Sequence, residues 1–259
     1  MPTALVTGAA RRLGRAMALY LARRGHDVAV HYAGSDSDAR AVVAEIEALG
    51  RRGVAVQADL LDEAAMQALV GRAAAALGAP LDCLINNASI FERDTLATAT
   101  AESWHRHFAS NLRAPFVLTQ QFAAQAPAAA TDTAGEPLAR ALVINMIDQR
   151  VRSLTPDFMT YTLAKSALWT LTQTAAQALA PAVRVNAIGP GPTLRGASQT
   201  AAQFARQRAA TILGRGADPA GITAALGFFL DSPAVTGQLI CVDGGQHLAW
   251  ETPDVMGVE

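Results

Sequence analysis

The second half of the chain contains a tyrosine, a lysine and an aspartate whose types and spacing suit acid–base chemistry. Tyr161 and Lys165 are four residues apart in an apolar stretch that predicts a helix from about 158 to 180, so their side chains share one face. A tyrosine titrates at about pH 10 in water, and a nearby ammonium group lowers that pKa. The pair is expected to give and take a proton near neutral pH, with the carboxyl group of Asp148 thirteen residues before Tyr161. Surface helices show the same Tyr/Lys spacing by chance, so the spacing alone does not distinguish a catalytic pair from a surface pair.

Lysine usage adds weight to position 165. The chain contains 21 Lys and Arg residues, and Lys165 is the only lysine among them. Arginine can replace lysine wherever only the charge matters, whereas a planar guanidinium cannot reproduce a compact, rotatable ammonium group. The bias therefore indicates that position 165 requires an ammonium group.

Composition and charge limit the classes of function. With 259 residues and 51% hydrophobic content, the chain can bury the core of one α/β domain. A net charge of −1 argues against a nucleic-acid surface or a polybasic membrane anchor. No apolar run approaches the roughly 18 to 20 residues of a membrane span, and no charged leader precedes one, so we expect a cytoplasmic protein. Cys83 and Cys241 lie in apolar runs without metal-ligand spacing, which predicts buried thiols and no metal site.

The elements that must position these residues alternate between strands and helices. Residues 4–7 read as a strand, 8–14 as a glycine-containing turn, and the amphipathic stretch to 24 as a helix. Such a unit lets a pyrophosphate approach the free N–H groups of the helix. Further strands are predicted at 27–32, 53–58, 82–87, 141–146, 183–188 and 239–242, and further helices at 36–49, 62–77, 101–125 and 218–231. The alternation predicts an α/β fold with one doubly wound parallel sheet.

Other segments are less regular. Pro115 removes a helical N–H and is expected to interrupt the helix at 101–125. Residues 126–139 read as a surface loop with a mobile tip, and 194–216 as a substrate lid with a helical centre or as an ordinary surface helix. The tail 247–259 has no strong pattern. His105 and His107 are two residues apart, which points them to different helix faces, so we expect two surface histidines and no metal site.

Seven short motifs, in this order, carry a resemblance to a known family over essentially the full chain. They are TGAARRLG at 7–14, Asp59-Leu60, Asn86-Asn87-Ala88, Asn111, Tyr161 with Lys165, Pro190-Gly191 and Val242-Asp243-Gly244-Gly245. On these motifs the chain resembles the short-chain dehydrogenases/reductases. The resemblance implies a single NAD(P)-binding domain over 1–259, a Rossmann-type sheet with strand order 3-2-1-4-5-6-7, and a homotetramer.

Two departures from the common family pattern narrow the resemblance. Arg12 stands where most members have glycine, and Asp148 stands where most have a catalytic serine. In both, the chain resembles the pteridine reductases, including the bacterial dihydromonapterin and dihydrofolate reductases of this fold. Further agreements are His31-Tyr32 with Ser35, and Asn87-Ala88-Ser89 followed by Phe91. Gly34 differs, because that subfamily often has arginine there.

The end of the second predicted strand bears on the choice of cofactor. An acidic residue there would hold the ribose hydroxyls of NAD and repel a 2′-phosphate, but no carboxylate occurs before Asp36. Arg12 and Ser35 could instead hold a 2′-phosphate. Positive charge at a helix N-terminus is normally avoided, so a bound anion explains Arg12 better than a solvated side chain does. These features favour NADPH.

The resemblance also implies roles for individual residues. The cofactor-binding residues would be Gly8, Arg12, Leu13, Gly14, His31, Tyr32, Ser35, Asp59, Leu60, Asn87, Ala88, Tyr161, Lys165, Pro190, Gly191 and Thr193. The catalytic residues would be Asn111, Asp148, Tyr161 and Lys165. The substrate-binding residues would be Ser89, Phe91, Asp148 and Tyr161, with the Phe91 ring stacked on a heterocycle. Without a cofactor role, Asp59 would be a cap near the helix that follows it.

We therefore predict an NADPH-dependent reductase of a pterin, a dihydropterin or dihydrofolate. The alternative within enzymes is a carbonyl or alcohol oxidoreductase acting on a sugar, a steroid or an acyl thioester, although an ionised Asp148 would repel the developing oxyanion. A third hypothesis is a cofactor-sensing protein without turnover. Against it, the chain retains Asn111, Tyr161 and Lys165.

Overall fold

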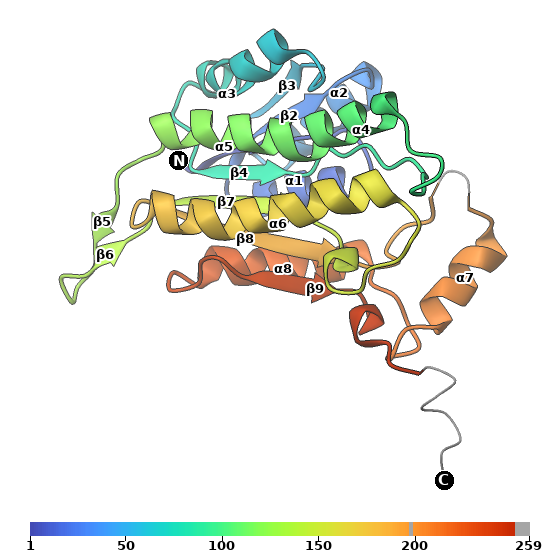
Figure 1. The fold of residues 1–259 in the computed structure, drawn as a ribbon. Helices are drawn as coiled ribbons and strands as arrows, with labels where there is room; N and C mark the ends of the chain where they lie inside the picture. The colour runs from blue at the N-terminus through green and yellow to red at the C-terminus, as the bar shows by residue number, and fades with distance from the viewer. Residues whose placement is uncertain (197–198, 252–259) are drawn as a thin grey trace.

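A seven-stranded parallel sheet forms the centre of the protein, which a computed structural model describes over residues 1–196 and 199–251 (Figure 1). The strand order is β3-β2-β1-β4-β7-β8-β9, which is the predicted order once two short hairpin strands are set aside. The strands are β1 (Thr3–Val6), β2 (Asp27–Tyr32), β3 (Gly53–Gln57), β4 (Cys83–Asn86), β7 (Ala141–Met146), β8 (Val183–Pro190) and β9 (Leu239–Val242). The order reverses between β1 and β4, where α/β sheets open a crevice at the carboxyl ends of the strands.

Helices cover both faces of the sheet, so the central strands are apolar throughout. Every residue of β1, β4 and β7 is buried. One apolar core lies under α1 (Arg12–Arg23), α2 (Asp36–Ala48) and α8 (Pro219–Asp231). The other lies under α3 (Glu63–Leu77), α5 (Ala114–Gln125) and α6 (Met159–Leu179). This arrangement confirms the predicted doubly wound α/β fold.

The predicted helix at 101–125 is interrupted as expected. It consists of α4 (Ala101–Phe108), a π-helical turn η1 (Ala109–Arg113) and α5. Pro115 is the second residue of α5, directly after Ala114, and has no N–H to give to the preceding turn. The turn changes the direction in which side chains leave the helix, and π-turns are frequent at functional sites.

Three expectations from the sequence are wrong. The segment 126–139 is not only a loop, because β5 (Ala130–Thr131) and β6 (Pro137–Leu138) pair as a small antiparallel hairpin that projects from the body (Figure 1). Cys83 is buried, but Cys241 is only half-buried, because β9 is the edge strand of the sheet. His105 is exposed, as predicted, whereas His107 is completely buried.

The remaining elements lie near the carboxyl ends of the strands. They are η2 (Gln149–Val151), α7 (Ala201–Ala209) and η3 (Gln246–Leu248). Helix α7 is the predicted helical centre of 194–216. In the tail, Trp250 is exposed, and residues 252–259 lie outside the described residues. Within the part of the chain that the structure describes, no helix is long and apolar enough to cross a membrane.

Candidate active site

A cavity of about 1120 Å³ opens at the carboxyl ends of the strands, between the turn before α1 and the start of α6. Seventeen of the predicted site residues line it: Gly8, Arg12, Leu13, Gly14, His31, Asp59, Leu60, Asn87, Ala88, Ser89, Phe91, Asp148, Tyr161, Lys165, Pro190, Gly191 and Thr193. A pocket for one drug-sized ligand is about 300 to 1,000 Å³. The cavity can therefore hold two ligands side by side.

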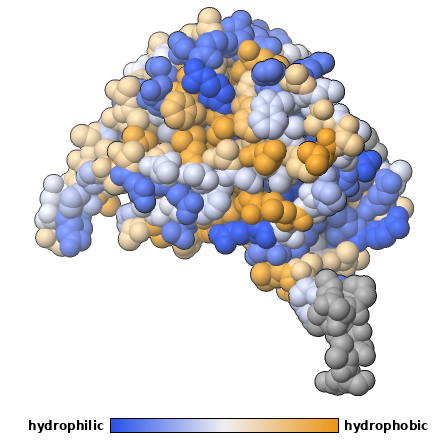
Figure 2. All heavy atoms as spheres, in the orientation of Figure 1, coloured by the Kyte–Doolittle hydropathy of each residue, from blue (hydrophilic) through white to orange (hydrophobic). Residues whose placement is uncertain are grey.

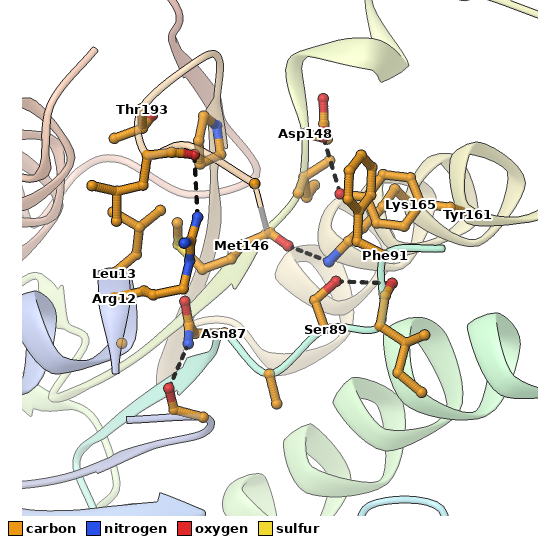
Figure 3. A pocket seen from close by; sticks show the side chains of 18 of the residues that line it. Arg12, Leu13, Asn87, Ser89, Phe91, Met146, Asp148, Tyr161, Lys165 and Thr193 are labelled. Atoms are coloured by element: carbon orange, nitrogen blue, oxygen red, sulfur yellow. Dashed lines mark hydrogen bonds between the residues drawn. The ribbon is translucent and has the colours of Figure 1, made fainter. Parts of the chain in front are cut away.

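Asp148 and Tyr161 form the acid–base pair of this cavity (Figure 3). The Tyr161 hydroxyl donates to Asp148 Oδ2 over 3.0 Å, and the other carboxylate oxygen accepts the Arg150 backbone N–H over 2.9 Å. This second bond caps η2 and fixes the carboxylate, because Asp148 is the N-cap of that turn. The pair thus has a defined geometry before any ligand arrives.

Burial controls the ionisation of both groups. It raises the pKa of the Asp148 carboxyl above its ordinary value, against hydrogen bonding and charge from Arg150. Burial also raises the pKa of Tyr161 well above 10, and the neighbouring Asp148 carboxylate adds to the shift. Tyr161 is therefore a neutral phenol at pH 7 and a proton donor, next to a carboxyl group that holds its proton more tightly than a solvated aspartate.

Lys165 lies on the same face of α6 as Tyr161 but does not lower the phenol pKa. Its Nζ donates to the Met146 backbone carbonyl over 2.8 Å and lies 5.7 Å from the centroid of the Tyr161 ring. Burial lowers the pKa of Lys165 to about 8, against the charge of Asp148. The expectation that the phenol titrates near neutral pH is wrong, because burial and Asp148 raise the pKa of Tyr161.

The glycine turn has the features of a pyrophosphate site. Helix α1 begins without a side-chain cap and has no acidic residue in its first turn, so its N–H groups favour an anion. A Cβ atom at Gly14 would lie 2.1 Å from the Gly8 carbonyl oxygen, so only glycine allows this close approach. Asn87 Nδ2 donates to the backbone carbonyls of Thr7 and Gly8 and holds the turn (Figure 3). A dinucleotide fits these residues.

Arg12 stands in this turn with a left-handed backbone, at φ 55°. Few residues other than glycine adopt this conformation without strain, which explains why a glycine is usual here. The guanidinium donates to the backbone carbonyls of Leu194 and Arg195 over 3.1 and 2.9 Å, and Figure 3 shows the first of these bonds. Arg12 therefore joins the turn to the segment predicted as a lid, and the strained backbone marks a constraint on its side chain.

Four predicted residues form hydrogen bonds within the protein, and two of them, His31 and Asp59, line the cavity. His31 Nδ1 accepts the Gly8 N–H over 3.0 Å, its Nε2 donates to the Ala58 carbonyl, and burial lowers its pKa to about 4. Asn111 holds both the N–H and the carbonyl of Ile90. The other two are Tyr32, whose hydroxyl donates to Asp36, and Asp59, which accepts the Leu61 N–H.

Three predicted residues do not line the cavity: Tyr32, Ser35 and Asn111. Tyr32 is turned toward Asp36 at the start of α2, and Ser35 is the N-cap of that helix. The side chain of Asn111 is fully buried behind the loop that it holds. Any contact of these three with a ligand requires a rearrangement or a bridging water.

The end of the cavity beside Tyr161 is aromatic and basic. The exposed ring of Phe91 stacks on Phe158 at 4.3 Å between centroids, and its other neighbour is Tyr161 at 4.7 Å, edge to face. The guanidinium carbon of Arg150 lies 4.8 Å from the centroid of Phe158. Reasoning from sequence missed Phe158 and Arg150, which precede α6 in a stretch without periodicity.

The segment 194–216 borders the same cavity. Gln203, Phe204 and Gln207 of α7 line it, and Arg208 fastens α7 to the backbone carbonyls of Pro192 and Gly216.

Within the described residues there is no group of three or more His, Cys, Asp or Glu side chains that could hold a metal ion. The Tyr161–Asp148 hydrogen bond and the glycine turn together suit proton transfer beside a bound dinucleotide.

Comparisons with known proteins agree with this geometry. A protein-family model described as "Enoyl-(Acyl carrier protein) reductase" matches residues 8–247. The solved structure of FolM Alternative dihydrofolate reductase 1 from Brucella suis in complex with NADP is 41% identical, with a TM-score of 0.90 and 98% of each chain covered. The promiscuous reductase LugOII, which catalyses a keto-reduction in lugdunomycin biosynthesis, is 31% identical, with a TM-score of 0.85 and coverage of 96% of this chain and 98% of that chain. The 3-oxoacyl-[acyl-carrier-protein] reductase FabG of Staphylococcus aureus strain Mu50 is 31% identical over 95% of this chain and 98% of its own length.

Proposed function

The chain belongs to the short-chain dehydrogenase/reductase family of oxidoreductases, and we propose that it uses NADPH to reduce a pterin, a dihydropterin or dihydrofolate. NADPH is supported by the NADP in the FolM structure and by the open N-terminus of α1 beside Arg12. The pterin class is supported most directly by the 3.0 Å hydrogen bond between Tyr161 and Asp148.

An Asp–Tyr pair suits the reduction of a ring C=N bond. When bound, NADPH supplies the hydride to the ring carbon. Tyr161 would give its hydroxyl proton to the adjacent ring nitrogen. The protonated form of Asp148 would then return a proton to the phenolate across the same 3.0 Å contact and take up a new proton from solvent. The raised pKa of Asp148 makes it a better proton source at neutral pH than a solvated carboxyl group. A hydrogen bond to the Met146 carbonyl holds the ammonium group of Lys165 close to this pair.

The direct test is a turnover panel with NADPH as the reductant. Biopterin, dihydrobiopterin, dihydromonapterin and dihydrofolate are compared with an aromatic ketone, a keto sugar and a 3-oxoacyl thioester. Turnover of at least one pterin or folate, and slower turnover of every ketone, is the expected result. Reduction of ketones without reduction of any pterin would overturn the proposal.

Ketone reduction is the second candidate function. FabG and LugOII, both 31% identical to this chain, act on keto groups according to their names. Tyr161 and Lys165 would serve that reaction as well. Against it, Asp148 becomes a carboxylate once it has given up its proton, and a negative charge beside the developing oxyanion of a reduced ketone opposes that reaction.

A homotetramer and a cytoplasmic location remain part of the proposal. The face of the protein over α5 and α6 shows apolar residues among polar ones (Figure 2). Phe116 of α5 and Leu163 of α6 are more than two-fifths exposed. Such exposed apolar side chains on neighbouring helices support an interface between subunits.

Replacement of Arg12 by glycine tests the choice of cofactor. Glycine adopts the left-handed backbone of position 12 freely, so the substitution removes the side chain and keeps the turn. A contact between arginine and phosphate contributes about 1.5 to 3 kcal/mol, so the Kd of NADPH should rise roughly tenfold or more. The Kd of NADH should hardly change. Fluorescence titration of both cofactors gives the two Kd values.

The matched control is Arg15→Ala on the same helix, which removes an exposed arginine paired with Glu45 and away from the cavity. It should leave both Kd values as they are. Equal weakening of NADPH and NADH by Arg12→Gly would mean that Arg12 only shapes the turn and its contact with 194–195.

Replacement of Phe91 by alanine tests the stacking face. The Phe91 ring is half exposed in the cavity beside Tyr161, so a flat heterocycle can lie against it. A lost aromatic pair costs about 0.5 to 1.5 kcal/mol beyond the lost area, so the substrate KM should rise by roughly threefold to more than tenfold. The Kd of NADPH should stay nearly unchanged. Leu96→Ala, which truncates a more exposed apolar residue outside the cavity, should change neither constant.

A further inference from the structure

The N-terminus of α6, the helix that carries Tyr161 and Lys165, is capped by a residue from a distant segment. The first N–H groups of a helix have no partner within it, and Phe158 at the N-cap position supplies no side-chain bond. Asp94, 4% exposed, takes this role: its backbone carbonyl accepts the Phe158 N–H over 2.8 Å, and its Oδ1 accepts the Thr160 N–H over 3.1 Å. A carboxylate at this end also matches the helix dipole.

The capping carboxylate belongs to a directed chain of hydrogen bonds behind Tyr161. His107 Nε2 lies 3.2 Å from the Glu92 backbone N–H and can only accept from it, so the ring proton is on Nδ1. Nδ1 then donates to Thr160 Oγ1 over 2.6 Å, and the Thr160 hydroxyl must donate to Asp94 Oδ2. Burial lowers the pKa of His107, in agreement with a neutral ring.

The same groups hold the loop that carries Phe91, which we call the substrate loop and define as residues 87–94. Helices grip its backbone at every second residue: Asn111 holds Ile90, His107 holds Glu92, and the start of α6 holds Asp94. Phe91 lies between the first two anchors. Its ring stacks on Phe158, whose left-handed backbone, at φ 58°, is held by the Asp94 carbonyl.

We propose that Asp94, Thr160 and His107 are positioning residues that set the distance between the Phe91 ring and the Tyr161 hydroxyl. Asp94 ends the substrate loop and caps the N-terminus of the helix that carries Tyr161, so a change at the cap moves the stacking face relative to the proton donor. Thr160 connects the two, because its hydroxyl accepts a hydrogen bond from His107 of α4 and donates one to Asp94 of the substrate loop. The inference rests on the proposed function only in treating Phe91 as a substrate-binding residue.

The test compares Thr160→Val with Thr160→Ser. Valine has the shape of threonine without the hydroxyl, so it leaves the Asp94 oxygen and the His107 N–H without their shared partner. The substrate KM should rise about tenfold, as for a residue coupled to its neighbours, while the Kd of NADPH stays within about twofold because no cofactor contact changes. Serine keeps the hydroxyl and should restore a KM near that of the wild type. An equal loss with serine would overturn the proposal.

A double-mutant cycle separates positioning from simple stability. If Thr160 acts through Phe91, Thr160→Val should raise the substrate KM by less than about twofold in a Phe91→Ala background, so the two effects are not additive. A helix cap without this role would lower only the melting temperature and the active fraction and leave KM unchanged, or it would give the same KM change in both backgrounds. Either result would contradict the inference.

The cycle is informative whatever the substrate class proves to be. If the wild type reduces a dihydropterin, KM is measured with that substrate. If it reduces only ketones, the proposed function fails, and KM is measured with an aromatic ketone, whose ring can also stack on Phe91. If Thr160→Val does not fold, Asp94→Asn replaces it, because the amide puts an N–H group opposite the Thr160 hydroxyl and keeps an acceptor for the Thr160 N–H. The same non-additivity with Phe91→Ala is expected.

Discussion

Replacement of Lys165 by arginine is expected to preserve the fold and to remove most turnover. The Lys165 side chain is 2% exposed, and its Nζ fits under the Met146 carbonyl, where a larger, planar guanidinium cannot take the same position. The pKa of the ammonium group is about 8, so it can also exchange a proton near neutral pH, which a guanidinium cannot do. Loss of a positioned proton-transfer group typically costs about 10² to 10⁴ in rate, so kcat should fall at least about a hundredfold.

Steady-state kinetics with saturating NADPH measure this loss, and circular dichroism with a thermal melt shows whether the fold is kept. Arg23→Lys, the reverse exchange at the exposed end of α1, is the matched control and should have wild-type kcat. A Lys165→Arg variant within a few-fold of wild-type kcat would show that charge alone suffices at position 165.

Replacement of Asp148 by serine should separate pterin reduction from ketone reduction. A serine hydroxyl can still accept the Arg150 N–H and cap η2, so the local fold should survive. It cannot hold a titrating proton for Tyr161, so kcat for the pterin should fall about a hundredfold or more. The new hydroxyl is a neutral donor for a developing oxyanion, so any weak ketone turnover should hold or rise.

Both reactions are measured on one preparation of the variant, which removes differences in active fraction. Asp148→Asn keeps the size of the side chain without the ionisable group and should lose pterin turnover to a similar extent. Survival of pterin turnover in Asp148→Ser, together with collapse of ketone turnover, would show that the carboxyl group does not take part in proton transfer.

Much of the fold follows from local patterns. Apolar runs bounded by turn residues predict the strands to within one or two residues, and strict strand–helix alternation predicts the parallel sheet. The shared face of Tyr161 and Lys165 also follows from helix geometry. These features depend on residues that are neighbours in sequence, so one chain is enough to predict them.

What could not be predicted depends on contacts between distant segments. The direction of the Tyr161 pKa shift is set by burial and by Asp148, and neither is expressed in the spacing of Tyr161 and Lys165. The spacing of His105 and His107 does not indicate which ring faces the core. His107 can be buried because its ring N–H donates a hydrogen bond to the Thr160 hydroxyl, 53 residues away. Asp94 and Thr160 are 66 residues apart, so no local pattern marks the cap of α6.

The burial of the only lysine has a practical consequence for stability measurements. A lysine-specific protease has a single cleavage site in this sequence, at Lys165 in the first third of the 21-residue helix α6. Proteases need an extended, accessible chain, so cleavage requires α6 to open and release Lys165 from the Met146 carbonyl. When opening and closing are fast, the cleavage rate reports the equilibrium population of that open form. The rate at which the two fragments, 1–165 and 166–259, appear on a gel therefore measures the opening of the helix that carries Tyr161.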